Sequence, residues 1–237
     1  MGRGLITDRS RGKNGSMGKR FYRIASTLIR AATPHPETVW EVPWDGQESI
    51  FVCNHARAMG PIDMAVYFPV KAYIWIYANA MSARDVPAYV RQDYWWNPEA
   101  KLAPLYNATV PYLAAAVLPP ILRSVPYVKV YHGTRALETL RESLRLMEQG
   151  NSMIIFPGIP DGYRSHQGTR INEGFLHLLP RHYKRTKRKC RIWPVHLDLE
   201  KPLFEVSAPI DWDEKRDFSE QVPELCEKIA LGIREEE

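Results

Sequence analysis

The sequence contains few cysteines, and none stands in a metal-binding arrangement. Its three cysteines are Cys53, Cys190 and Cys226, and no two of them form a C-x-x-C motif. Scattered cysteines of odd number argue against a zinc site and against a disulfide framework, and they fit a reducing compartment best. We therefore expect no bound metal.

Long apolar runs are missing as well. No stretch of eighteen or more apolar residues occurs, and the first residues lack the apolar core of a signal peptide. The nearest candidate, residues 110–122, is short and interrupted by prolines. It fits either a buried core helix, which we favour, or a segment that dips into a membrane interface. A G-x-S-x-G motif is also absent, which argues against a serine hydrolase.

Length and charge indicate the class of protein and the kind of partner. The chain has 237 residues, 45% of them hydrophobic and 25% charged, which suits one large α/β domain without requiring a second. A net charge of +5 indicates an anionic partner: nucleic acid, a phosphorylated metabolite or a lipid surface. The basic run 184–189 is typical of a solvated loop, although it could hold lipid headgroups or coenzyme A phosphates. No nucleic-acid motif accompanies it, so nucleic acid is not an expected partner.

Strand and helix patterns alternate along the chain. Their order predicts an α/β layer fold, and no linker divides residues 33–237. Residues 80–125 look helical but broken by several prolines. We expect strands at 50–53, 72–77, 127–131, 153–156, 192–197 and 204–207, and helices at 61–69, 134–149, 171–183 and 220–237.

The N-terminal part has a different composition. Residues 1–18 are rich in Gly, Arg, Lys and Ser, and are expected to be flexible. Residues 19–32 form an amphipathic pattern, with an apolar stripe that includes Phe21 and Leu28 between basic residues. Such a helix can lie on an anionic membrane surface or dock on the protein's own core.

The most informative stretch is the end of the first buried strand. An apolar run of strand length stops at Asn54-His55, and a Gly60-Pro61 break follows. In open α/β folds such a strand end lies at the edge of the sheet where ligands bind. Histidine can also exchange a proton near neutral pH. The simpler alternative is a structural histidine that is hydrogen-bonded to a loop.

Four short stretches, in order, resemble the 1-acylglycerol-3-phosphate acyltransferase family. The first is Phe51-Val52-Cys53-Asn54-His55, an Asn-His pair after an apolar strand. The others are a strand that leads to a basic residue before a long helix, a strand that ends in Phe-Pro before an Arg-Ser pair, and a strand with a central Pro-Val. These correspond to residues 128–135, residues 154–157 with Arg164-Ser165, and residues 192–195.

The resemblance implies a single α/β domain with a mixed central sheet flanked by helices. It also implies transfer of a fatty acyl group to a lysophosphatidate-like glycerolipid hydroxyl in phospholipid biosynthesis. The donor would be acyl-CoA or acyl-carrier protein, with no further cofactor. The protein would be peripheral, on the cytoplasmic face of the cell membrane. His55 would be the general base, with Asp63 as the residue that orients its ring.

The resemblance also implies residues that bind the substrate. Arg135 could meet a phosphate with the help of free N–H groups at its helix start, and Arg164 could pair with one in bidentate fashion. The alternatives are a solvated arginine at 135 and a plain turn at Asp161-Gly162. The expected set is Asn54, Arg57, His132, Arg135, Asp161 and Arg164.

Two positions depart from the family pattern. The family has an Asp five residues after the His, where this chain has Gly60, and the first Asp here is Asp63. The family's Glu after Phe-Pro is replaced by Gly158. These departures leave a second hypothesis open, a non-catalytic member that binds lipid or an acyl thioester.

Overall fold

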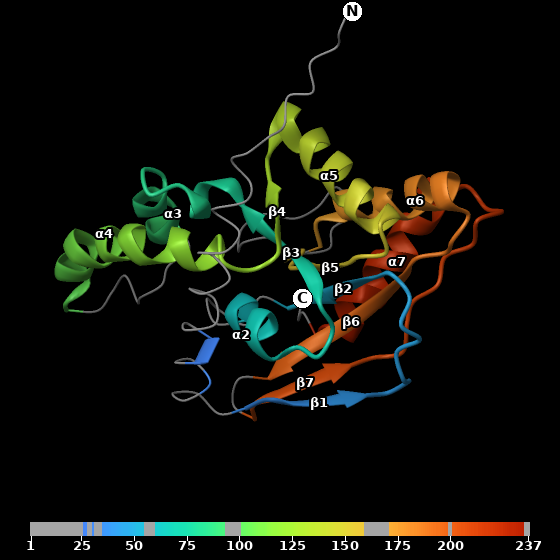
Figure 1. Ribbon diagram of the computed structural model, residues 1–237, viewed down its shortest axis with the longest axis horizontal. Helices are drawn as coiled ribbons and strands as arrows, with labels where there is room; N and C mark the ends of the chain where they lie inside the picture. The colour runs from blue at the N-terminus through green and yellow to red at the C-terminus, as the bar shows by residue number, and fades with distance from the viewer. Residues whose placement is uncertain are drawn as a thin grey trace, which may run out of the picture. The chain divides into compact units, whose positions relative to one another are not determined.

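The computed structural model falls into two compact units, which are described separately (Figure 1). The larger comprises Pro34–Ala78 and Pro126–Glu237, and the smaller contains Asn79–Val125 together with the described residues before Pro34. The structure describes residues 26, 27, 30, 35–54, 60–92, 101–158, 171–198 and 201–234. Most of the predicted N-terminal segments, 1–18 and 19–32, therefore lie outside the described residues.

The larger unit is built on a seven-stranded sheet with the order β1-β7-β6-β2-β5-β3-β4. The strands β6, β2, β5, β3 and β4 are parallel, whereas β7 pairs with β6 in antiparallel fashion and β1 is parallel to β7. The predicted mixed sheet is thus confirmed. The strands are β1 (Glu37–Trp40), β2 (Ser49–Cys53), β3 (Ala72–Tyr77), β4 (Tyr127–Val130), β5 (Ser152–Ile155), β6 (Arg191–Asp198) and β7 (Leu203–Val206).

Helices cover both faces of this sheet, as the α/β prediction requires. The helices α5, α6 and α7 lie on one face and α2 lies on the other (Figure 1). All four were predicted. The bounds of α2 and α5 agree within two residues, whereas α6 begins at Leu178 rather than at 171, after a 3-10 helix, and α7 ends at Gly232 rather than at 237. Their bounds, with those of the short 3-10 helices, are α2 (Gly60–Tyr67), η2 (Gly133–Arg135), α5 (Ala136–Glu148), η3 (Glu173–His177), α6 (Leu178–Thr186) and α7 (Phe218–Gly232).

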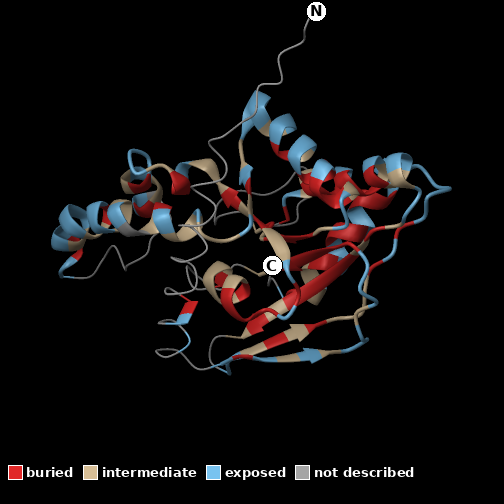
Figure 2. Ribbon diagram, viewed as in Figure 1, coloured by how far each residue is buried: buried red, intermediate tan, exposed pale blue. Residues whose placement is uncertain are grey.

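The central strand β2 divides its side chains between the two faces. Ile50 and Val52 belong to the core under α5, α6 and α7. Phe51 is on the opposite face, where its ring lies 5.0 Å from that of Phe68 and stacks on Trp193 at 6.5 Å. Every residue of β2 is buried (Figure 2). A strand buried on both faces needs a continuous apolar run rather than an alternating one, which explains the pattern in the sequence.

The smaller unit contains η1 (Ala78–Met81) at its boundary, α3 (Val86–Gln92) and the long α4 (Ala103–Leu122). The helix α4 continues through three internal prolines, so the expectation that prolines break this region is wrong for these residues. Pro111 has no N–H to offer the carbonyl of Asn107 four residues earlier. The Arg91 guanidinium on α3 donates to that carbonyl instead, at 3.1 Å. A contact between the two helices thus satisfies the acceptor that the proline leaves free.

The favoured burial of residues 110–122 is also wrong. Tyr112 and Leu113, at the centre of α4, are 59% and 68% exposed. Within the described residues, α4 is the one helix that is long and apolar enough to cross a membrane, judged by length and composition alone.

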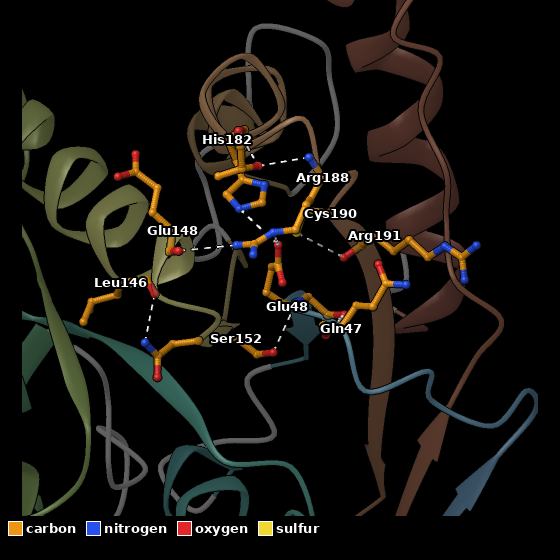
Figure 3. Close-up of polar contacts among 12 residues, drawn as sticks. Gln47, Glu48, Leu146, Glu148, Ser152, His182, Arg188, Cys190 and Arg191 are labelled. Carbon is orange, nitrogen blue, oxygen red and sulfur yellow. Dashed lines mark hydrogen bonds and ion pairs between the residues drawn. The ribbon is translucent and has the colours of Figure 1, made fainter.

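A polar cluster lies at the start of β2, the end of the strand opposite Asn54, and its contacts are drawn in Figure 3. Glu48, just before β2, is 9% exposed, and its carboxylate lies 2.5 Å from Nε of Arg188 and 3.4 Å from Nε2 of the fully buried His182. Arg185 pairs with Glu148, and Lys189 with Glu214. The predicted solvated loop at 184–189 is therefore partly helical, and several of its cations are paired with carboxylates rather than left for an anionic ligand.

The buried His182 makes stability depend on pH. Burial lowers the pKa of this imidazole, and the nearby Arg188 cation acts in the same direction, against Glu48. The stability gained from a neutral ring is complete above the unfolded-state pKa of about 6.5 and is lost as the pH falls from there toward the folded-state pKa. Between about pH 7.5 and about pH 5.5 we expect the free energy of unfolding to fall more steeply in the wild type than in His182→Leu, by at most about 1.4 kcal/mol per pH unit. Urea titrations at several pH values measure this, and equal slopes would contradict it.

The C-terminal helix α7 approaches β6 closely at a glycine. A Cβ atom on Gly232 would stand 2.5 Å from Cβ of Pro194. We expect Gly232→Ala to destabilise the protein by about 1–3 kcal/mol, because α7 must move away from the sheet. Urea denaturation measures the loss. Leu231→Ala, at a side chain that is 72% exposed, is the matched control and should change stability little.

Candidate active site

The carboxyl ends of the parallel strands meet at one edge of the sheet, and the connections diverge there. After β2 the chain passes through α2 toward β3, and after β5 it passes through η3 and α6 to β6. Because β2 and β5 are neighbours and these helices cover opposite faces, a topological switch point lies between the two strands. Open α/β sheets bind ligands in the crevice outside such a point.

One predicted site residue, Asn54, and the Phe-Pro motif follow directly on these strand ends. Asn54 comes immediately after β2, and Pro157 and Gly158 follow β5 closely. The parallel register, with Val52 opposite Ile155, brings these two chain segments to the same edge although they lie about a hundred residues apart in the sequence. Predicted site residues outside the described residues, which therefore stay predictions, are His55, Arg57, Asp161 and Arg164.

Asn54 is held by the neighbouring strand. Its Oδ1 accepts from the backbone N–H of Leu197 at 2.7 Å, and its Nδ2 donates to the carbonyl of the same residue at 3.1 Å. The side-chain amide thus continues the β2–β6 ladder one position past Cys53, which pairs with Val195. These contacts give Asn54 a positioning role, since they fix the point at which the chain leaves the sheet. Substrate binding by Asn54 stays a prediction.

Asp63 is in the first turn of α2, the helix that follows β2 in the chain. The side chain is half-buried, and burial raises the pKa of its carboxyl group. Within the described part of the chain, no hydrogen bond or ion pair reaches this carboxylate. A carboxylate near a helix N-terminus is stabilised by the helix dipole, and Asp63 keeps its acceptor oxygens for a donor such as an imidazole N–H. Its geometry relative to His55 stays a prediction.

The ends of β3 and β4 carry His132 and Arg135 together with two tyrosines. The ring of His132 stacks on that of Tyr77, with centroids 5.0 Å apart. The exposed Arg135 makes a bidentate ion pair with Glu138, with both contacts at 2.9 Å, and its guanidinium lies 3.8 Å from the ring centroid of Tyr131. A phosphate at Arg135 would have to share this cation with Glu138.

Tyr77 and Tyr131 were missed by the sequence interpretation. Both stand at or just after the end of a strand, beside a histidine or an arginine. An aromatic residue at a strand end on the ligand-binding edge, next to a basic residue, is the signal that could have indicated them.

The chain that follows β5 is fixed at both sides of residues 159–170. Gly158 forms an antiparallel bridge with Ile171, and the N–H of Asn172 donates to the carbonyl of Pro157 at 2.9 Å. Asp161 and Arg164 belong to the segment between these contacts. The residues that flank this segment therefore both lie at the carboxyl end of β5, beside β2.

Comparison with known proteins gives likenesses to solved structures but no match at the level of sequence. No family model matches the sequence, and no curated protein matches it. The fold is similar to the crystal structure of the 1-acyl-sn-glycerophosphate (LPA) acyltransferase PlsC from Thermotoga maritima, with 16% sequence identity and a TM-score of 0.45. The match covers 98% of this chain and 83% of that chain. A likeness at this level does not assign an activity.

The contacts of Asn54 lead to a stability prediction. Asn54→Ala leaves the Leu197 N–H and carbonyl without these partners, so we expect a loss of about 1–3 kcal/mol. Asn54→Asp should also destabilise, because it places an oxygen against the Leu197 carbonyl. Urea denaturation followed by circular dichroism measures both effects, with the exposed Asn79→Ala as the control. Unchanged stability in both variants would contradict the positioning role.

Proposed function

We propose that the protein transfers a fatty acyl group from an acyl thioester to the hydroxyl of a lysophosphatidate-like glycerolipid. The observation that carries this proposal is the convergence of the four motif stretches on one sheet. The Asn-His strand end, the Phe-Pro strand end and the Pro-Val strand are the neighbours β2, β5 and β6, and the basic residue opens α5 at the same edge. The described parts of stretches far apart in the sequence thus belong to one sheet and end at the same side of it, which supports the proposal.

The proposed reaction needs one base and no metal. The imidazole of His55 removes the proton of the acceptor hydroxyl as its oxygen attacks the thioester carbonyl. The tetrahedral intermediate then breaks its C–S bond, and the leaving thiolate receives the proton from the imidazolium. The products are the acyl ester and the free thiol of coenzyme A or acyl-carrier protein.

Asp63 is proposed to orient the imidazole and to stabilise its charged form. Burial raises the pKa of this half-buried carboxyl group, and no cation among the described residues lowers it. An imidazolium formed during the reaction would supply such a cation, so the interaction would be strongest when the ring is charged. This is the difference between ground state and transition state that accelerates a reaction.

The remaining predicted residues are proposed to hold the phosphate end of the acceptor. His132 and Arg135 approach it from the end of β4, and Arg57, Asp161 and Arg164 from the segments that follow β2 and β5. The protein would then act peripherally, on the cytoplasmic face of the cell membrane, where its acceptor lipid resides.

A second candidate is a non-catalytic protein that binds lipid or an acyl thioester. Two glycines favour it. Gly60 begins α2 and is buried, and Gly158 is bridged to Ile171, so both positions where the family has a carboxylate belong to backbone contacts here. This candidate shares the switch point but predicts binding without turnover.

A product assay separates the two candidates. Purified protein is incubated with acyl-CoA and lysophosphatidate, and again with acyl-carrier protein as the donor carrier. We expect His55→Ala to lower the rate of acyl transfer by about 10²–10⁴-fold, the usual contribution of a general base. Asp63→Asn should lower this rate less. His35→Ala, at the far edge of the sheet before β1, is the control.

The outcomes are distinct. Equal rates in the wild type and His55→Ala remove His55 from the mechanism. Tight binding of acyl-CoA with no product in the wild type supports the non-catalytic candidate.

A further inference from the structure

The helix α4 presents an apolar surface without a described partner. None of its twenty residues is charged, and its exposed residues include Leu105, Tyr112 and Leu113 at 55%, 59% and 68%. Exposed Ala108 and Ala116 extend the same side of the helix. A helix that is apolar all round belongs in a protein core or in a lipid environment, and exposed patches of this kind mark interaction sites.

The charges around α4 favour an anionic partner. Residues 79–92 and 101–125, the described stretches around α4, contain four cations, Arg84, Arg91, Lys101 and Arg123, and one acid, Asp85. Lys101 and Arg123 flank the two ends of the helix. Cations at the border of an apolar helix are typical of segments that bind anionic lipid.

The position of Arg91 along α4 distinguishes a helix that spans a membrane from one that lies on its surface. Its guanidinium is 5.5 Å from the ring centroid of Tyr112, the tenth of the twenty residues of α4. In a spanning helix of about 30 Å this cation would stand at the centre of the bilayer, where charge is most costly. In a helix parallel to the surface the same guanidinium can reach the lipid phosphates.

We propose that α4 lies in the plane of a membrane interface, with Leu105, Tyr112 and Leu113 inserted among the acyl chains of an anionic bilayer and Arg91 at the level of the headgroups. This surface differs from residues 19–32, which the sequence suggested as the membrane contact. The proposal does not depend on acyl transfer, because membrane binding is measured without substrate.

Vesicle sedimentation tests the surface. The full-length protein is mixed with vesicles of phosphatidylcholine alone or with about one third phosphatidylglycerol, a composition chosen for its negative charge. We expect binding to the anionic vesicles, and a loss of at least about tenfold in Leu105→Gln/Leu113→Gln, since each leucine contributes more than about 1.4 kcal/mol when buried. Val42→Gln/Leu231→Gln changes two exposed side chains of the larger unit and should bind like the wild type.

A labelling experiment reports the contact even where the double variant fails to fold. The native cysteines are buried, and burial raises the pKa of each thiol, to about 11 for Cys226, so they react poorly. A polarity-sensitive fluorophore attached to Leu113→Cys should shift to the blue with anionic vesicles, and the same label at Leu231→Cys should not. A helix parallel to the surface also places labels at Leu105→Cys and Leu113→Cys at similar depth, so that lipid-bound quenchers affect them equally.

Three results would overturn the proposal. One is the absence of a shift at position 113 when the wild type binds vesicles, which would assign membrane binding to another segment such as 19–32. Another is a wild type that binds no anionic vesicles. The last is a wild-type dimer that Leu105→Gln/Leu113→Gln converts to a monomer, measured by analytical ultracentrifugation, which would show that a second copy covers α4.

Discussion

The strand β2 is tied to the β6 segment at both of its ends, and the rest of the sheet depends on this. Before its first residue, Glu48 pairs with Arg188, which lies shortly before β6. After its last residue, Asn54 binds both backbone polar groups of Leu197 near the end of β6. With five fully buried residues between these contacts, β2 cannot slip relative to β6 without breaking polar contacts at both ends. The position at which the chain leaves the sheet after β2 is thereby fixed.

The amino ends and the carboxyl ends of the parallel strands carry side chains of different chemistry. At the amino ends of the parallel strands, the Glu48 carboxylate pairs with Arg188 and lies 3.4 Å from Nε2 of the buried His182. The carboxyl ends are followed by Asp63, which has no described partner, and by the exposed His132. An ion pair such as Glu48–Arg188 ties two segments of the fold together, whereas half-buried or exposed groups at the carboxyl ends are accessible to a ligand. The basic run, conspicuous in the sequence, thus belongs mainly to the fold.

Local patterns predicted much of this structure, and long-range contacts account for what they missed. Apolar runs located β2 and β5, and the spacing of leucines located α5, because the spacing of apolar residues reflects which side chains are buried. The strand β1 was missed, since four residues that pair with β7 have little signal of their own. The continuity of α4 depends on Arg91, and the role of Asn54 depends on a residue 143 positions away. No window of sequence contains both members of such pairs.

The order of strands in the sheet also governs how the chain can acquire its structure during synthesis. The neighbours of β2 are β5 and β6, whose last residues are Ile155 and Asp198. A nascent chain therefore exposes the wholly apolar β2 while a hundred or more residues are still to be translated, and pairing across such separations is slow. Until then this strand is an aggregation hazard. The protein is expected to need protection by chaperones up to the emergence of β6, and truncation before that point should leave an insoluble chain rather than a smaller folded one.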